Sequence, residues 1–225
     1  MDWGKKPRRR RLVALLPALA ATLLAGCSTE SLPSNALPET HEEAETPAAF
    51  LDFCVRFPDQ CAKQQGTRTR LTLDDRTMQQ LITVNHAVNT AITPEDDKTH
   101  YGVDDYWTIP SDGRGDCEDY ALTKRRDLLA AGLPASVLRM AVVYSIKTAL
   151  HAVLTVATDK GDLVLDNANN EIVLWNATDY TWIMVQNKAN PMVWDSLRPA
   201  SAHRGSTGGR SRVSLTNLLT DPDGK

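Results

Sequence analysis

Apolar side chains recur at helical spacing over two segments of the chain. Over residues 71–92 they fall at three- and four-residue intervals, with Asp74 near the start. Over residues 116–131 the same spacing returns, and Gly132 follows its last turn. An apolar stripe that begins near an acidic residue and ends at a glycine is typical of an amphipathic helix. We therefore expect helices over both segments.

Short β-type runs follow the second of these helices. They are rich in Val, Leu, Ile, Thr and aromatic residues, and Lys-Thr, Asp-Lys-Gly and Asn-rich turns separate them. The runs cover residues 137–146, 149–158, 161–166, 171–175 and 181–186. Residues 101–115 contain several Gly, Pro and Asp residues and predict a loop. Helices followed by a mostly antiparallel sheet predict an α+β domain.

The first 26 residues have the pattern of an export signal. A basic segment is followed by an apolar run over residues 12–24, which is shorter than the roughly 20 residues that span a bilayer. The motif Leu24-Ala25-Gly26-Cys27 then resembles the lipobox of bacterial lipoproteins, in which the signal is cut before a cysteine that becomes lipidated. Ser28 resembles the sorting pattern for the outer membrane. We expect export and lipid anchoring in the periplasm through Cys27; the alternative is a chance cysteine behind an ordinary signal.

Composition divides the rest of the chain into a domain and two polar ends. Residues 27–49 are rich in Pro, Ser, Thr and Glu and predict a flexible tether, and residues 199–225 predict a flexible tail. The domain over residues 50–198 is long enough for one hydrophobic core. Six of the 25 basic residues lie within the first eleven positions, so the remainder is more acidic than the formal net charge of −3. Such a surface argues against nucleic-acid binding.

Two cysteines in the domain are close in sequence. Cys54 and Cys61 lie seven residues apart on either side of Pro58. In an exported protein this spacing predicts a local disulfide. The alternatives are two buried thiols or a metal-binding pair, and the latter lacks further ligands at zinc-type spacing.

The remaining cysteine, Cys117, has the position of a nucleophile. It follows Gly113-Arg114-Gly115-Asp116 and therefore stands in the first turn of the second helix. Free backbone N–H groups and the positive end of a helix favour a thiolate and are expected to lower the thiol pKa. The alternative interpretation is a buried structural thiol.

A base and an orienting carboxylate follow in the strands. Of the five histidines, only His151 lies in a predicted strand directly behind a turn. Asp166 ends the predicted strand over residues 161–166, which is the second strand after that turn. Nucleophile and base are usually neighbours in space rather than in sequence, so Cys117, His151 and Asp166 form a candidate catalytic triad. Taken singly, His151 could be a core histidine and Asp166 a turn former.

Motifs over most of the domain match those of a known family. They are Phe53-Cys54 to Pro58 to Cys61, Val84-Asn85 to Val88-Asn89, Tyr101 to Trp107, Gly115 to Tyr120, Lys124-Arg125-Arg126, His151 to Leu154 and Val164 to Asn167. With these motifs the chain resembles the family of bacterial transglutaminase-like cysteine proteinases, the LapG-like periplasmic proteases. The resemblance implies a papain/transglutaminase-like core, with Cys117 as nucleophile, His151 as general base and Asp166 as the group that orients the imidazole.

The resemblance also implies calcium, held by the acidic residues around the nucleophile. In this chain these are Asp116, Glu118 and Asp119. Three carboxylates around one helical turn repel one another unless a positive charge is near, which favours calcium. The alternative is that Asp116 and Asp119 cap the helix. No organic cofactor is expected.

The function that the resemblance implies is that of a calcium-dependent cysteine endopeptidase. Family members cleave surface adhesins, and some are sequestered by a membrane receptor that senses a cyclic dinucleotide. We expect a protein substrate, such as a biofilm adhesin. A non-catalytic calcium-binding adaptor and an amide-transferring enzyme of the transglutaminase type are the alternatives, and a murein amidase is a weaker one.

Overall fold

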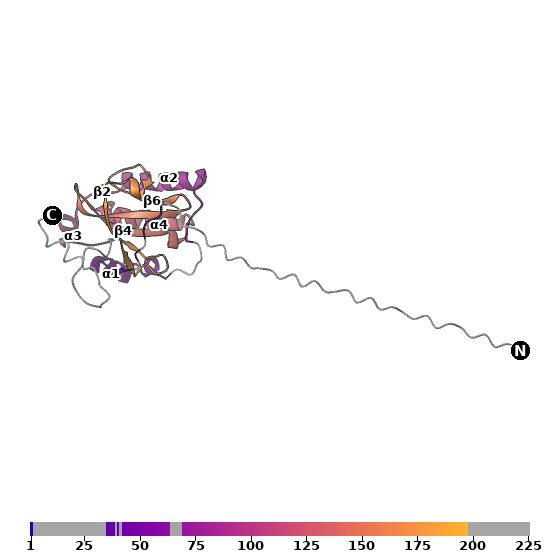
Figure 1. The fold of residues 1–225 in the computed structure, drawn as a ribbon. Helices are drawn as coiled ribbons and strands as arrows, with labels where there is room; N and C mark the ends of the chain where they lie inside the picture. Colours follow the sequence, from indigo (N-terminus) through magenta and orange to yellow (C-terminus); the bar gives the residue numbers. More distant parts are fainter. Residues whose placement is uncertain (2–34, 39, 41, 64–68, 198–225) are drawn as a thin grey trace, which may run out of the picture. The chain divides into compact units, whose positions relative to one another are not determined.

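The computed structural model of the chain describes residues 1, 35–38, 40, 42–63 and 69–197 (Figure 1). The expected signal peptide over residues 1–26, the lipidation site Cys27 and the tail over residues 199–225 lie outside the described residues, apart from Met1. Within the described ranges, no helix has both the length and the apolar character that crossing a membrane requires.

The helices lie mainly in the first half of the described chain. Their bounds are α1 Ala48–Arg56, η1 Pro58–Cys61, α2 Asp75–Ala91, α3 Asp97–Tyr101, α4 Cys117–Ala130, η2 Ala135–Val137 and η3 Trp175–Ala177. The two expected helices are confirmed as α2 and α4. Helix α2 begins later than expected because the Asp74 side chain caps it, accepting a hydrogen bond from the N–H of Thr77 at 2.7 Å. Leu71 instead forms a bridge with Thr158 of strand β5.

A seven-stranded sheet forms the other part of the domain. Including two strands outside this sheet, β2 and β3, the strands of the described chain are β1 Glu43–Ala44, β2 Thr93–Pro94, β3 Arg114–Gly115, β4 Leu138–Ser145, β5 Ala149–Thr158, β6 Gly161–Leu165, β7 Val173–Leu174, β8 Thr181–Gln186 and β9 Trp194–Ser196. The order in the sheet is β1-β9-β8-β4-β5-β6-β7, with every neighbouring pair antiparallel. Strands β2 and β3 form a separate parallel pair. The five expected strands and the α+β class are therefore confirmed.

The central strands are buried on both faces. Along β4, Met140 and Val142 belong to one apolar cluster, and the alternate residues Ala141 and Val143 belong to a second. Helix α4 packs against β5 and β4, and α2 packs against α4 (Figure 1). A sheet covered on both faces holds its register tightly, because a slip by one residue would exchange the two faces.

Part of the segment that was expected to be a flexible tether packs on the domain. Leu37 is 2% exposed in the second apolar cluster, and its N–H donates to the Asp162 carboxylate at 2.6 Å. Strand β1, over Glu43–Ala44, pairs with β9. The prediction of a flexible tether is wrong for these residues. Burial of one leucine stabilises the packed conformation of this segment by about 2 kcal/mol. The polar residues around Leu37 gave no sign of this contact in the sequence. The folded domain begins before residue 50.

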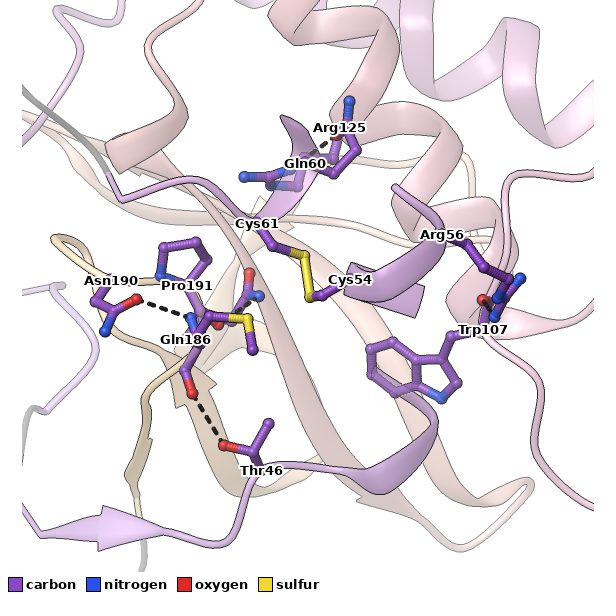
Figure 2. The surroundings of a disulfide bond; sticks show 11 residues. Thr46, Cys54, Arg56, Gln60, Cys61, Trp107, Arg125, Gln186, Asn190 and Pro191 are labelled. Atoms are coloured by element: carbon purple, nitrogen blue, oxygen red, sulfur yellow. Dashed lines mark hydrogen bonds between the residues drawn. A yellow bond between two sulfur atoms is a disulfide. The ribbon is translucent and has the colours of Figure 1, made fainter. Parts of the chain in front are cut away.

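A disulfide joins Cys54 of α1 to Cys61 of η1, with their Cα atoms 5.6 Å apart (Figure 2). The predicted pairing is confirmed. Next to it, Gln60 accepts a hydrogen bond from Arg125 of α4 at 2.9 Å, and Arg56 donates to the carbonyl of Trp107 at 2.8 Å (Figure 2). The disulfide thus stabilises a short segment that contacts both α4 and the loop leading to it.

Candidate active site

Several contacts fix the start of helix α4, where Cys117 is the first residue. The N–H of Glu95 donates to the carbonyl of Gly115 at 3.0 Å, which ties β2 to the segment before the helix. The Tyr120 hydroxyl donates to the carbonyl of Ile92 at 2.6 Å. Position 115 requires glycine because a Cβ atom there would overlap the carboxylate of Asp119. The thiol is therefore carried on a firmly held helix end.

Sheet register brings His151 and Asp166 together. Strands β5 and β6 align Leu154 with Leu165, so Asp166, the next residue, continues the strand opposite Val153. It then lies on the same face as His151, one diagonal step away. His151 Nε2 and Asp166 Oδ1 are 2.8 Å apart, and both side chains are buried.

Cys117 and His151 border one cleft of about 450 Å³. The Cys117 sulfur accepts a hydrogen bond from the N–H of Ala152 at 3.3 Å, which puts the thiol beside the main chain next to His151. The cleft is lined by Pro94, Glu95, Asp96, Asp116, Cys117, Thr148, Leu150, His151, Asn167 and Ala168. The structure thus places the three candidate triad residues in one connected arrangement.

Asp166 is surrounded by donors. Its Oδ1 also accepts from the N–H of Ala168 at 3.0 Å, its Oδ2 accepts from the Tyr180 hydroxyl at 2.5 Å, and its carbonyl accepts from the Asn89 amide at 2.8 Å. Burial alone would raise the pKa of Asp166, but the hydrogen bond and charge of His151, with the Tyr180 hydroxyl, hold the pKa below its ordinary value. An ionised carboxylate only accepts, so Nε2 of His151 carries the proton and Nδ1 is the nitrogen that is left to accept one.

The environment of the Cys117 thiol differs from the expectation. Burial raises its pKa well above the ordinary value, the charge of Glu118 raises it further, and the Ala152 N–H partly opposes them. The thiol donates to the Glu118 carboxylate, with sulfur and oxygen 3.2 Å apart. The prediction of a lowered thiol pKa is therefore wrong. It rested on the helix end alone and left out the burial and these acidic neighbours.

Acidic side chains from three segments converge beside the thiol. One carboxylate oxygen each from Asp97, Asp116 and Asp119 lies within 4.8 Å of the others, and Asp97, Asp105 and Glu118 form a second such group. Three buried carboxylate oxygens in the described part of the chain have no hydrogen-bond partner: Oδ1 of Asp97, Oδ1 of Asp116 and Oδ2 of Asp119. Unpartnered buried carboxylate oxygens of this kind are ligands suited to calcium.

The pKa values of the cluster show the same excess of negative charge. Burial raises the pKa of Asp119 to about 8 despite the N–H of Thr108, and the charges of Asp116 and Asp97 add to the rise. Burial and the neighbouring Asp116 raise the pKa of Glu118 well above its ordinary value. A cation among these groups would offset the repulsion that raises them. The residues present therefore fit a divalent cation.

The structure adds two ligand candidates to the predicted set and argues against the capping alternative. Asp97, at the start of α3, and Asp105 were missed; each is the second residue of an Asp-Asp pair, which was the signal available in the sequence. Asp116 stands at the N-cap of α4 without a side-chain cap hydrogen bond. Asp119 accepts instead from the N–H of Thr108 at 2.8 Å, outside the helix.

A buried amine lies on the same helix. Lys124 is fully buried, and within the described ranges its Nζ has no hydrogen-bond partner. It lies 6.0 Å from the centre of the Tyr120 ring. Burial lowers the pKa of Lys124 to about 7, and the negative charge of Asp166 partly opposes this.

One known protein family is similar to the chain over most of its length. A sequence profile described as bacterial transglutaminase-like cysteine proteinase matches residues 40–202, which is well over half of the chain. No curated protein matches the chain.

Solved structures of LapG from Legionella pneumophila are similar to the chain. The EGTA-treated form is 32% identical with a TM-score of 0.44, over 49% of this chain and 63% of that chain. The calcium-bound form is 27% identical with a TM-score of 0.46, over 65% of this chain and 81% of that chain. This chain thus spans less than two thirds of the EGTA-treated relative.

Lys124 gives a prediction about stability and pH. Its amine binds a proton up to about pH 10.5 when the chain is unfolded, but only up to about pH 7 when it is folded. Because folding releases this proton between those values, the free energy of unfolding contributed by this group rises with pH from about 7 to 10. The stability difference between the wild type and Lys124→Met should therefore shift in favour of the wild type over that range.

Urea unfolding at pH 7, 8 and 9, at one fixed calcium concentration, measures this difference. Lys160→Met is the matched control, because Lys160 is exposed in the turn between β5 and β6. Its stability difference from the wild type should not change with pH. A pH-independent difference for Lys124→Met as well would contradict the assignment.

Proposed function

The chain belongs to the bacterial transglutaminase-like cysteine proteinases, a family of cysteine peptidases in the transglutaminase-like superfamily, and we propose on this ground that it hydrolyses a peptide bond in a protein substrate. The observation that carries the proposal is the cleft shared by Cys117 and His151, with His151 held by the Asp166 carboxylate at 2.8 Å. A nucleophile, a base and an orienting group in this order are the parts that acyl transfer needs.

The first half of the reaction forms an acyl-enzyme. His151 takes the thiol proton at Nδ1, since Nε2 is occupied by Asp166, and the Cys117 thiolate attacks the substrate carbonyl carbon. The main-chain N–H of Cys117, at the free end of α4, donates to the oxyanion. His151 then gives its proton to the leaving amine, the C–N bond breaks, and a thioester remains.

The second half returns the free enzyme. His151 removes a proton from water and the hydroxide attacks the thioester carbon. The C–S bond then breaks to give a carboxylic acid product, and His151 returns its proton to the Cys117 sulfur. Asp166 fixes the imidazole orientation and stabilises its positive charge in both halves. An amine in place of water would give amide transfer; the family, being one of proteinases, favours water.

We propose that calcium binds at Asp97, Asp116 and Asp119, with Asp105 and Glu118 next to them. The support is the set of three buried, unpartnered carboxylate oxygens that converge there. This extends the predicted set of Asp116, Glu118 and Asp119 by residues from the α3 region. Bound calcium would supply positive charge beside the start of α4.

We further propose that the protein is exported and anchored by lipid on Cys27, at the periplasmic side of the outer membrane, and that it cleaves an exported or surface protein such as a biofilm adhesin. The support is the basic and apolar pattern of residues 1–26 followed by the lipobox-like motif. Several acyl chains at about 0.8 kcal/mol per buried CH₂ would anchor it stably. Regulation by a membrane receptor stays a prediction of the resemblance.

Substitutions in the triad test the catalytic proposal. Cys117→Ser and His151→Ala should each lower peptide-bond cleavage by at least about 100-fold, because each removes a group that acts in bond-making or proton transfer. Asp166→Asn should lower it by a smaller factor, since the amide oxygen can accept from the imidazole but carries no negative charge to stabilise an imidazolium. The measurement is the appearance of new protein N-termini, by mass spectrometry, when exported proteins of the source bacterium are incubated with each variant.

A labelling control and the nature of the products complete this test. Iodoacetamide labelling of residues 27–225 carrying Cys27→Ser reports on Cys117, the free cysteine among the described residues. Labelling should be slower in His151→Ala. New isopeptide cross-links without new N-termini would favour amide transfer, and equal cleavage by Cys117→Ser would refute the proposed chemistry.

Calcium removal tests the metal proposal. Calcium should raise the melting temperature of the wild type relative to EGTA, because it neutralises repulsion among buried carboxylates. Asp119→Asn removes one charge but can still accept from the Thr108 N–H, so it should weaken calcium binding at least about tenfold, or 1.4 kcal/mol, without unfolding the loop. Isothermal titration calorimetry measures the affinity.

Asp104→Asn is the matched control for the calcium site. Asp104 lies beside Asp105 in the loop between α3 and β3, is exposed, and pairs with Lys98 at 3.0 Å. Its calcium affinity should equal that of the wild type. A wild type that binds no calcium at millimolar concentration would disprove the site.

Lipidation is tested by Cys27→Ser in the source bacterium. The wild type should partition with membranes and incorporate labelled fatty acid, whereas the variant should do neither, since the thiol that forms the thioether is gone. Wild-type protein that is free of lipid and absent from membranes would contradict the anchoring proposal.

A further inference from the structure

We propose that Tyr180 is a positioning residue for the candidate triad, which holds the Asp166 carboxylate in the orientation that pairs with His151. This inference rests on the proposed function, because it assigns a role within the same site. It concerns a residue just before β8, at a distance in sequence from both partners.

The two oxygens of the Asp166 carboxylate are held in different ways. Oδ1 accepts from His151 and from the N–H of Ala168. Oδ2 accepts from the Tyr180 hydroxyl at 2.5 Å, the one side-chain donor to this atom in the described part of the chain. Without that hydroxyl, rotation of the carboxylate about its terminal bond would be opposed only at Oδ1. Tyr180 therefore supplies the second point that defines the plane of the carboxylate.

Tyr180 also touches the histidine itself. The centroids of the Tyr180 and His151 rings are 5.7 Å apart, with an angle of 64° between their planes. This edge-to-face arrangement is the favoured geometry for aromatic pairs. One side chain thus contacts both members of the pair, its hydroxyl the carboxylate and its ring the imidazole.

Sheet register explains why Tyr180 reaches this place. Val143 of β4 lies opposite both His151 of β5 and Trp182 of β8. Tyr180 precedes Trp182 by two residues and so shares its face of the sheet. The segment before β8 is itself fixed, since the Trp182 indole N–H donates to the Thr178 hydroxyl at 3.3 Å.

The hydroxyl of Tyr180 is a donor rather than a phenolate. Burial raises its pKa, and the hydrogen bond to Asp166 raises it further. Tyr180 and Asp166 also border a second cavity of about 300 Å³, whereas Tyr180 does not line the cleft that contains Cys117. Loss of the hydroxyl should therefore admit water to Oδ2 and loosen the carboxylate without altering the walls of that cleft.

Tyr180→Phe tests the proposal, because it removes the hydroxyl and keeps the ring. The matched control is Thr158→Val, which removes a buried hydroxyl hydrogen bond of 2.6 Å to the carbonyl of Gly161, at the end of β5 away from His151. Both variants are compared with the wild type as residues 27–225 carrying Cys27→Ser, loaded with calcium. Thermal unfolding is recorded for each, so that a general loss of stability is seen separately.

The first readout is the NMR signal of the His151 Nε2 proton in the hydrogen bond to Asp166. In the wild type it should lie downfield and exchange slowly with water, and Asp166→Ala, which removes the acceptor, should identify it by its loss. Tyr180→Phe should broaden it or speed its exchange, whereas Thr158→Val should leave it unchanged. An unchanged signal in Tyr180→Phe would overturn the proposal.

The second readout is the rate of Cys117 alkylation by iodoacetamide at pH 7. Tyr180→Phe should slow it about tenfold, the size expected for one lost hydrogen bond to a charged group, and Thr158→Val should change it less than twofold. Equal slowing in both variants would mean that Tyr180 is merely structural. If His151→Ala leaves the rate unchanged, the proposed function fails, and the NMR readout alone decides on Tyr180.

Discussion

The concentration of negative charge at the start of helix α4 is the constraint on which the site depends. A thiol and several carboxylates share this place, and the burial that shapes the site also removes the water that would solvate them. The dipole of the helix favours negative charge there, but its effect is limited to about 2 kcal/mol even where the groups are buried. The raised pKa values of Glu118 and Asp119 show that this is not enough. The chain alone therefore does not balance the charge at its candidate nucleophile.

The other half of the site depends on a different constraint, the register of the sheet. His151 lies in β5, Asp166 directly follows the neighbouring strand β6, and Tyr180 directly precedes β8, on the other side of β4. Because β4 and β5 are buried on both faces, these strands cannot slip without exposing apolar side chains. The base and its partners are thus held by the rigid core, and the thiol is held by a helix end whose charge needs a counter-ion. The cleft lies where these two parts meet.

The sequence predicts those features of the fold and site that depend on local pattern. Helical spacing, β-type runs and turn residues were sufficient for α2, α4 and five strands, and the short separation of Cys54 and Cys61 was sufficient for the disulfide. Features that depend on distant contacts were missed. Asp97 joins Asp119 only because α3 lies near the start of α4, and Leu37 is buried only because strands that follow far along the chain supply the apolar cluster on which it packs.

The acidic residues around Cys117 differ in what they can reveal about the site. Glu118 accepts from the thiol at 3.2 Å and also belongs to the groups that could hold a cation, so any substitution of it alters the nucleophile and the cation site together. Asp97 and Asp119 do not touch the thiol; they accept from the N–H groups of Tyr106 and Thr108 and so connect the cation site to the preceding loop. Binding of a cation there would stabilise that loop and the helix start at once. Asp97 and Asp119 are therefore the positions at which the effect of calcium on structure can be separated from its effect on the thiol.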